Sequence, residues 1–276
     1  MIPKIIHYCW FGGNPIPEEY KQYIESWKQY CSDYEIKKWD ETNFDINSSA
    51  FVKEAYEAKK WAFVSDYARL KIIYDEGGIY LDTDVELIKN LDSFLVDKCF
   101  LAEETSGYVN TGLGFGAEKG NPIIRKMLEE YDGHFLLKDG KYDVLPCPSK
   151  NTQPLLKQGY KYSGKEIWKN EFVTIYPPRY FCPIDYETGN ISIISDTVSI
   201  HHFTASWQNK NDAKILAIHR FCACHFGKSM GYSIARKLDF PYRVKNKIEM
   251  QGIKETVRFA INKLSRKDKL VNNGRE

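Results

Sequence analysis

The sequence predicts an α/β protein, and three observations carry this prediction. Short apolar runs alternate with segments of helical periodicity from the N-terminus onward. Hydrophobic residues make up 43% of the chain, enough to bury a substantial core. The 276 residues fit one large α/β domain with a modest appendage better than two independent domains.

The first elements form a strand-helix-strand unit. Residues 3–11 are an apolar run closed by two glycines, which predicts a buried strand. A helix follows, because Tyr20, Ile24 and Trp27 recur at helical spacing. Residues 34–39 predict a second strand. This order is typical of a parallel sheet.

A long helix and the strand after it come next. Between residues 62 and 76 apolar side chains recur at helical spacing, and Gly77-Gly78 supply a left-handed stop. The pattern then changes to that of a strand over residues 79–87. Further elements are predicted as a helix over 121–132 and strands over 99–104, 111–117, 172–176 and 197–203.

The C-terminal part of the chain is basic. Residues 236–276 contain 12 Lys and Arg and 5 Asp and Glu, whereas the whole chain carries a formal charge of only +2. Whole-molecule basicity therefore gives no reason to expect nucleic acid as a partner. Apolar residues at helical spacing over 253–264 predict an amphipathic helix. We predict a main domain over 1–235 and a basic helical tail over 236–276, which either docks on the domain or contacts an anionic membrane surface.

The cysteines and the hydropathy indicate the compartment. Seven cysteines at irregular spacing in a chain of this length favour a reducing environment. The N-terminus lacks the charged segment, apolar run and cleavage site of a signal peptide. No apolar run approaches the ~18–20 residues that cross a bilayer. The sequence predicts a cytoplasmic protein, attached at most to the inner face of the cell membrane.

The most informative motif is Asp82-Thr83-Asp84 at the end of an apolar strand. Side chains two apart on a strand point to the same face, so both carboxylates can converge there. This edge of an open α/β sheet is where nucleotides and their metals bind. Mg²⁺ and Mn²⁺ prefer oxygen ligands, and two carboxylates leave positions for phosphate oxygens. The motif alone is also typical of a solvated strand end, so the surrounding sequence must distinguish a metal and nucleotide site from such an end.

Three segments in the same order resemble the glycosyltransferases of the D-x-D sugar-binding group, family 32. These include capsular-polysaccharide transferases and fungal initiating mannosyltransferases, with more distant similarity to the catalytic domain of the large glucosylating toxins. The segments are residues 3–13, 61–87 and 199–207, and the resemblance spans about residues 1–207. It implies that residues 1–235 form a catalytic domain of GT-A type, with a Rossmann-like mixed sheet flanked by helices. It also implies a nucleotide-sugar donor, a Mn²⁺ or Mg²⁺ ion and retention of anomeric configuration.

The resemblance further implies which residues hold the ion. Asp84 matches the direct metal ligand, and Asp82 matches the residue that contacts the donor ribose and the ion. His201 matches the position that can complete the metal shell. His202 is the alternative, because neighbouring residues on a strand point to opposite faces.

Other residues are implied to bind the donor. Asp66 and Arg69 match an S-D-x-x-R element whose carboxylate binds sugar hydroxyls and whose guanidinium approaches the sugar or diphosphate. Outside this context they would be an ordinary helical ion pair. Trp10 matches an aromatic residue against the base, and Asn110 a polar residue near the reacting face of the sugar. Ser206-Trp207 match a segment that closes over the diphosphate.

The sequence thus predicts a hexosyltransferase that uses a UDP-sugar in preference to GDP-mannose and acts on a surface-polysaccharide or lipid-linked glycan. Two alternatives stay open. Phosphatases with an aspartate nucleophile also begin with D-x-D after a strand, but they expect Thr or Val where this chain has Glu86. A binding module that has lost catalysis would hold the nucleotide sugar or glycan without transfer or hydrolysis.

Overall fold

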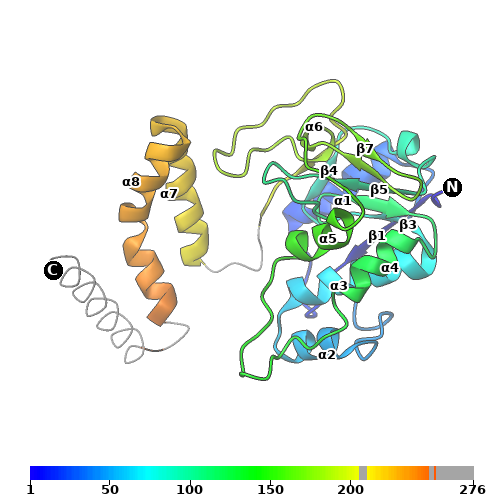
Figure 1. Cartoon of the computed structure of the whole chain (residues 1–276), viewed down its shortest axis with the longest axis horizontal. Coiled ribbons are helices and arrows are strands. Elements are labelled where there is room, and N and C mark those ends of the chain that lie inside the picture. The colour runs from blue at the N-terminus through cyan, green and yellow to red at the C-terminus, as the bar shows by residue number, and fades with distance from the viewer. Residues whose placement is uncertain (205–209, 249–251, 253–276) are drawn as a thin grey trace. The chain divides into compact units, whose positions relative to one another are not determined.

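The computed structural model describes residues 1–204, 210–248 and 252 of the chain (Figure 1). Contacts divide the chain into two compact units. The first comprises residues 1–186 and 190–207, and the second residues 187–189 and 208–276. Ser206, Trp207 and the predicted helix over 253–264 lie outside the described residues. The predicted boundary between residues 235 and 236 stays a prediction.

The first unit is built on a seven-stranded sheet with the order β2-β1-β3-β6-β5-β8-β7. Strand β1 is parallel to β2 and β3, and β5 is parallel to β8, whereas β6 and β7 run antiparallel to their neighbours. A separate two-stranded antiparallel sheet pairs β4 with β9. The strands are β1 (Ile5–Cys9), β2 (Glu35–Trp39), β3 (Gly78–Tyr80), β4 (Val85–Leu87), β5 (Cys99–Ala102), β6 (Phe115–Ala117), β7 (Trp168–Lys169), β8 (Thr174–Tyr176) and β9 (Ser199–His201).

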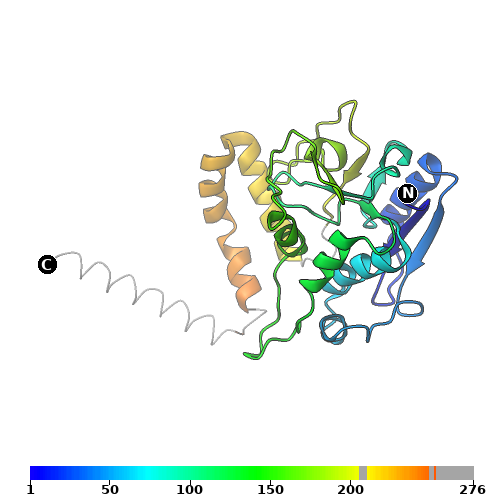
Figure 2. The ribbon, with the colours of Figure 1, turned by 45° about the vertical axis from the view of Figure 1, so that its right-hand side comes forward.

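Helices cover both faces of the large sheet, as Figures 1 and 2 show. Along β5, Cys99 and Leu101 face a core that includes side chains of α2, α3, α4 and α5, while Phe100 and Ala102 face a core with α1, α6 and the small sheet. The α/β class and the mixed sheet flanked by helices are therefore confirmed. The helices are α1 (Glu18–Tyr30), α2 (Ala50–Glu57), α3 (Trp61–Glu76), α4 (Pro122–Glu129), α5 (Cys147–Leu156), α6 (Pro178–Phe181) and a 3₁₀ turn, η1 (Asp92–Phe94).

The Gly77-Gly78 pair sets the position of β3 against β1. Gly77 ends α3 with φ +73°, a left-handed conformation that glycine adopts readily. A Cβ at Gly78 would lie 2.8 Å from Nε2 of His7 and 2.9 Å from the carbonyl oxygen of Ile5. The missing side chain thus allows β3 to approach β1 closely and fixes the point at which the D-x-D motif leaves the sheet.

The prediction of one continuous strand over residues 79–87 is wrong. Strand β3 ends at Tyr80 and β4 begins at Val85. Between them the backbone turns, and the N–H of Val85 donates to the carbonyl of Asp82 at 3.0 Å. The turn is required because the chain leaves the large sheet here and joins β9 in the small one.

The second unit contains a helical hairpin of α7 (Lys210–Phe226) and α8 (Lys228–Leu238). The helices pack closely, because a Cβ at Gly231 would lie 2.5 Å from the carbonyl oxygen of Cys222. At the end of α8 the buried carboxylate of Asp239 lies 2.8 Å from Nε2 of His219. Within the described part of the chain, every helix is too short or too polar to span a lipid bilayer.

His7 is a buried histidine that joins three elements. The indole N–H of Trp39 donates to its Nδ1 at 3.0 Å, and its Nε2 lies 3.0 Å from the carbonyl oxygen of Gly77. This pattern assigns the ring proton to Nε2. Burial lowers the pKa of His7 from 6.5 to about 4. The folded chain therefore holds His7 neutral at a pH where the unfolded chain protonates it.

We expect His7 to make the fold sensitive to mild acid. Between pH 6.5 and 4 the unfolded state binds a proton that the folded state does not, so the free energy of unfolding falls as the pH falls. From pH 7 to 5 this loss amounts to about 2 kcal/mol. Urea unfolding at both pH values should show a larger loss for the native chain than for His7→Gln. Equal losses would contradict the assignment.

Candidate functional site

Two carboxylates and an imidazole meet beside the small sheet. Asp82 and Asp84 lie in the turn between β3 and β4, and His201 ends β9 opposite Val85. Nε2 of His201 lies 3.2 Å from Oδ1 of Asp84 and 4.0 Å from Oδ2 of Asp82. One ligand atom from each residue lies within 4.8 Å of the others. The aspartates converge through the turn, not through the shared face of a strand as predicted.

The structure places His201, and not His202, beside these carboxylates. Nε2 of His202 lies 2.9 Å from the Glu86 carboxylate, and its ring stacks on Tyr23 with 4.4 Å between centroids. The two histidines point to opposite sides of β9 and its extension, as the alternation of a strand requires.

A buried arginine links α3 to the D-x-D turn. Nη2 of Arg69 lies 3.1 Å from Oδ1 of Asp66 and 3.3 Å from Oδ1 of Asp82. Its Nε donates to the carbonyl of Ser65 at 3.1 Å, which fixes the guanidinium along the helix. The S-D-x-x-R element and the D-x-D turn, predicted to act together, thus share one cation.

The loop before β6 closes against the same carboxylate. Oδ1 of Asn110 accepts the N–H of Gly112 at 2.7 Å, and its Nδ2 donates to Glu104 at 3.0 Å. A Cβ at Gly112 would lie 2.5 Å from Oδ2 of Asp82 and 3.3 Å from Nη1 of Arg69. The bare backbone of Gly112 therefore leaves the space that the Asp82 carboxylate occupies.

Trp10 follows β1 at the edge of this region and is half-buried. Its indole N–H donates to the carbonyl of Asn14 at 2.6 Å. Its ring lies edge-on to Tyr20, with 5.8 Å between centroids. Part of the indole is therefore open to a ligand while its orientation is fixed.

Three residues that the sequence did not single out contact the site. The hydroxyl of Tyr80 donates to Oδ1 of Asp82 at 3.0 Å, and its ring lies 5.1 Å from the Arg69 guanidinium. Thr204 donates two hydrogen bonds to Asp84. Cys147, at the start of α5, lies 4.0 Å from Arg69. Strand alternation could have identified Tyr80, two residues before Asp82, and Thr204 lies three residues after His201 in the segment 199–207, whereas no local signal marks Cys147.

Burial and neighbouring charges shift the pKa values of the two aspartates of the turn in opposite directions. Burial would raise the pKa of Asp84, but His201 and the hydrogen bonds from Thr204 outweigh it and hold this pKa well below its ordinary value. Burial raises the pKa of Asp82, although Arg69 opposes the rise. Burial would lower the pKa of His201, but Asp84 and then Asp82 raise it overall. Charge on each group therefore depends on its neighbours.

The pKa of Asp66 is shifted in the same direction as that of Asp82, and for the same reasons. Burial raises the pKa of Asp66 to about 6, although Arg69 opposes the rise. Among the described residues, Asp66 and Asp82 thus share one permanent cation, Arg69, while Asp84 pairs with His201. This excess of buried negative charge suits the binding of a further cation.

The residues fit a divalent metal ion. Asp82 and Asp84 offer carboxylate oxygens, and His201 directs Nε2 toward them while its buried Nδ1 has no hydrogen-bond partner among the described residues. Two oxygens and one imidazole nitrogen leave further positions open on an octahedral ion. The structure thus brings together the predicted metal residues, with Asp66, Arg69 and Asn110 beside them.

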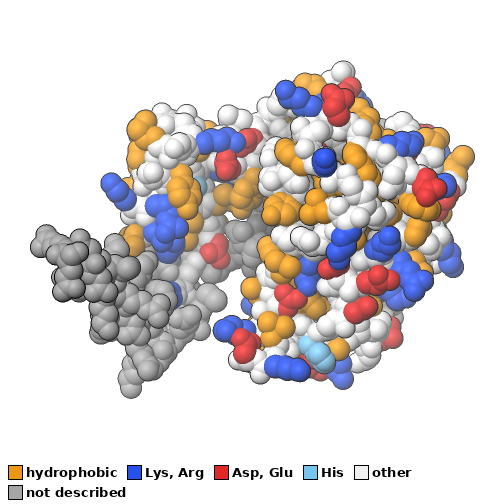
Figure 3. Space-filling model, in the orientation of Figure 1, with side chains coloured by type: hydrophobic (Ala, Val, Ile, Leu, Met, Phe, Trp, Pro, Cys, Tyr) orange, Lys and Arg blue, Asp and Glu red, His pale blue; other side chains and the backbone are white. Residues whose placement is uncertain are grey.

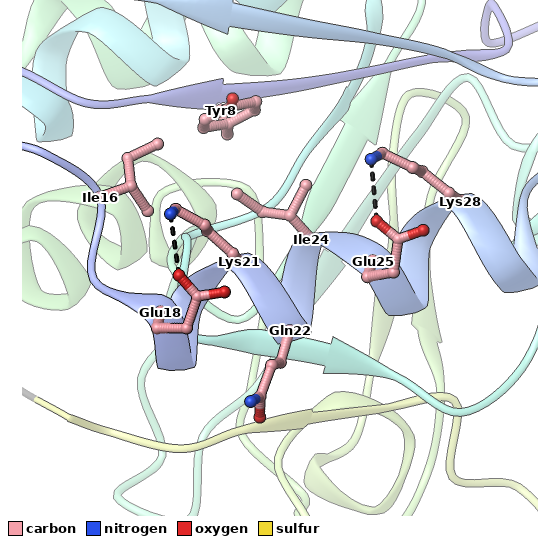
Figure 4. A pocket seen from close by; sticks show the side chains of 8 residues that line it. All are labelled: Tyr8, Ile16, Glu18, Lys21, Gln22, Ile24, Glu25 and Lys28. Carbon is pink, nitrogen blue, oxygen red and sulfur yellow. Dashed lines mark hydrogen bonds and ion pairs between the residues drawn. The ribbon is translucent and has the colours of Figure 1, made fainter.

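A groove along α1 is a weaker candidate (Figure 4). Its charged side chains neutralise one another, because Lys21 pairs with Glu18 and Lys28 with Glu25, both at 2.8 Å. Tyr8 and Ile24 form its apolar wall. It has no cluster of metal ligands or unpaired charges among these lining residues, so the acidic turn carries the functional argument.

Comparison with known proteins matches this part of the chain to one family. Residues 17–101 match the glycosyltransferase sugar-binding region containing a DXD motif. The matched region extends from just before α1 into β5 and contains Asp66, Arg69, Asp82 and Asp84.

Curated relatives agree with this match. An uncharacterized glycosyltransferase of Acanthamoeba polyphaga mimivirus is 38% identical over 101 residues, covering 34% of this chain and 40% of the relative. Inositol phosphoceramide mannosyltransferase 3 of Schizosaccharomyces pombe is 31% identical over 132 residues, covering 46% of this chain and 36% of the relative. A mannosyl phosphorylinositol ceramide synthase of Saccharomyces cerevisiae is 28% identical over 229 residues, covering 78% of this chain and 54% of the relative. The resemblance to D-x-D glycosyltransferases is confirmed, and the chain spans about half or less of these relatives' length.

We expect Gly112→Ala to damage the site and leave the fold intact. The new methyl group would displace the Asp82 carboxylate, the end of a side chain that can move without disturbing the core. Mn²⁺ affinity, measured by electron paramagnetic resonance, should fall at least about 10-fold while the melting temperature stays close to that of the native chain. Gly133→Ala is the matched control, since a Cβ there meets nothing within 4 Å. Equal Mn²⁺ affinity in both variants would contradict the placement of Asp82.

Proposed function

We propose that this chain, which carries a D-x-D glycosyltransferase sugar-binding region, transfers a hexose from a nucleotide-diphosphate sugar to a glycan acceptor with retention of configuration. One observation carries the proposal. The D-x-D turn, His201 of β9 and the Asp66–Arg69 pair of α3 come from separate parts of the chain and meet in one site. The match to the sugar-binding region supports it independently.

We propose Mn²⁺ as the preferred ion, with Mg²⁺ as the second choice. Asp82, Asp84 and His201 would hold it. Carboxylates suit both ions, whereas an imidazole nitrogen is a better ligand for a first-row transition metal than for Mg²⁺. When bound, the ion would neutralise charge on the diphosphate leaving group.

The chain's own residues would position the donor. Arg69 is buried and held by Ser65, so it offers fixed N–H donors to the diphosphate or the sugar. Asp66 would accept hydrogen bonds from sugar hydroxyls, Asn110 would face the reacting side of the sugar, and Trp10 would stack on the base. Attack by the acceptor on the leaving-group face and double displacement both give retention.

We propose a UDP-hexose as donor and a surface-polysaccharide or lipid-linked glycan as acceptor. Two of the relatives are named for mannosyl transfer to inositol phosphoceramide or for its mannosylated product, which supports a lipid-linked acceptor. The same names make GDP-mannose the second donor to test.

A cytoplasmic position at an anionic membrane surface is also proposed. Its support is the basic tail over 236–276 together with the hairpin of α7 and α8. Basic and hydrophobic side chains both appear on the visible face of this unit, at the left of Figure 3. Exposed aromatic and aliphatic residues of the hairpin region are Phe221, Phe226, Met230, Tyr232, Leu238 and Phe240.

The first experiment is a thermal-shift panel of nucleoside diphosphates and nucleotide sugars with and without Mn²⁺, followed by transfer assays with the donor that stabilises most. We expect Asp84→Asn to lower transfer at least about 100-fold, because an amide is a poor substitute for the metal-binding carboxylate. Asp139→Asn is the control, since this exposed carboxylate pairs only with Lys141 among the ion pairs of the described residues.

Near-native transfer by Asp84→Asn would defeat the proposed site. Tight binding of a donor by the native chain with neither transfer nor hydrolysis would instead identify a binding module. Release of phosphate from simple monoesters would favour the aspartate-nucleophile phosphatase.

The membrane proposal predicts binding to vesicles that contain phosphatidylglycerol and not to vesicles of phosphatidylcholine alone. A full-length variant with Lys254, Arg258 and Lys263 changed to Gln should bind roughly 100-fold more weakly, because each cation near an anionic surface contributes about 1 kcal/mol. Vesicle co-sedimentation measures this.

The control removes the same number of positive charges from the first unit, by Lys→Gln changes at Lys53, Lys119 and Lys126, all of which are exposed. It has the same net charge as the tail variant. If both variants lose vesicle binding equally, net charge alone acts and the tail has no specific role.

A further inference from the structure

Thr204 holds one oxygen of the Asp84 carboxylate. Its backbone N–H and its hydroxyl both donate to Oδ2 of Asp84, at 3.0 and 2.9 Å. The other oxygen, Oδ1, faces Nε2 of His201 at 3.2 Å. The two oxygens of this carboxylate therefore have separate partners, and Oδ1 is the one directed to the proposed metal position.

A tyrosine on α1 contacts the same threonine hydroxyl. The hydroxyl of Tyr20 lies 2.9 Å from Oγ1 of Thr204. The Thr204 hydroxyl has one proton, and the ionised carboxylate of Asp84 can only accept a hydrogen bond. Thr204 therefore donates to Asp84, and Tyr20 donates to Thr204. The chain of donors runs from Tyr20 through Thr204 to Asp84, and each bond strengthens the next.

The backbone around Thr204 is shaped to make these bonds. The N–H of His202 donates to the carbonyl of Asp84 at 3.0 Å, so residues 202–204 hold both the backbone and the side chain of Asp84. Phe203 adopts a left-handed conformation with φ +50°, which is costly for a residue with a side chain. Its ring lies edge-on to His201, with 4.2 Å between centroids. Packing and hydrogen bonds offset the strain.

Tyr20 is itself held in place. It is buried on α1, and its ring lies edge-on to Trp10. One side chain thus contacts both the residue proposed to stack on the base and the threonine that orients Asp84. A phenol fixed in this way can restrain the carboxylate without touching the ion.

We propose that Tyr20 is a positioning residue of the metal site: acting through the Thr204 hydroxyl, it orients Asp84 so that Oδ1 is presented to the ion. This inference rests on the proposed use of Asp84 as a metal ligand. Partners of ligating carboxylates commonly change metal affinity by 10- to 100-fold when they are removed.

The test measures Mn²⁺ affinity of the full chain without nucleotide, by electron paramagnetic resonance of free Mn²⁺. Tyr20→Phe keeps the ring and its contact with Trp10 and removes only the hydroxyl, and it should weaken Mn²⁺ binding about 10-fold. Thr204→Val should weaken it by 10- to 100-fold, and Thr204→Ser, which keeps the hydroxyl, should restore it. The double variant Tyr20→Phe with Thr204→Val should bind no more weakly than Thr204→Val alone, since the phenol acts through Thr204.

Tyr23→Phe is the matched control. It removes a hydroxyl from the same helix, but this one donates to Glu19 at 3.0 Å and not to Thr204. Its Mn²⁺ affinity should equal that of the native chain. Circular dichroism melts of all variants separate a loss of metal affinity from a loss of folding.

The inference is overturned if Tyr20→Phe and Thr204→Val bind Mn²⁺ like the native chain while Asp84→Asn does not. It is also overturned if the double variant loses the sum of the two single effects, which would mean that the residues act independently. Native Mn²⁺ affinity in Asp84→Asn would instead defeat the proposed function, so the two failures are distinguishable.

Discussion

The site depends on the turn that takes the chain out of the large sheet between Asp82 and Val85. The N–H of Val85 closes this turn on the carbonyl of Asp82, and the Val85 carbonyl accepts the indole N–H of Trp27 at 2.7 Å. Beyond the turn, β4 pairs with β9 and so brings His201 to the aspartates. If β3 continued straight through these residues, β4 would not pair with β9. His201, at the end of β9, would then lie away from the two carboxylates.

Charge compensation explains why so many polar groups gather there. Arg69 is buried between two carboxylates and also lies over the Tyr80 ring. Its single positive charge partly compensates both Asp66 and Asp82. Among the described residues, the Asp84 carboxylate is compensated by His201 and by the hydrogen bonds from Thr204. Buried charges are costly unless they are paired and hydrogen-bonded. A bound cation would therefore complete the charge compensation. The helix α3, the turn and β9 each contribute charged groups whose burial is unfavourable without it.

The sequence predicted the parts of the site that have a local signature and missed those that do not. Helical periodicity and Gly77-Gly78 located α3 and the start of β3, and D-x-D marked the acidic turn. The sequence predicts a strand across this turn, because apolar residues lie on both sides of Asp82 and Asp84 and do not reveal that the strand pairing is interrupted there. Helix α5 was missed because Pro148 and Pro154 are typical of loops, yet Pro148 lies in its first turn, where the missing N–H costs little. Thr204 lies in the segment 199–207 together with the predicted His201, but its contact with Asp84 has no motif of its own, and Cys147 comes from a part of the chain with no local signal at all.

The site is completed by residues outside the region that matches the family. The region that matches the family begins at residue 17 and ends at residue 101, so it contains Tyr20 and the acidic turn but neither His201 nor Thr204. Only two residues separate His201 from Thr204, and the backbone N–H groups of His202 and Thr204 donate to the carbonyl and the carboxylate of Asp84. A sugar-binding region of this kind is therefore not self-sufficient here. The Asp84 carboxylate contacts the segment that follows β9, about 100 residues beyond the matched region, and this segment meets α1, at the beginning of that region, in the hydrogen bond between Tyr20 and Thr204.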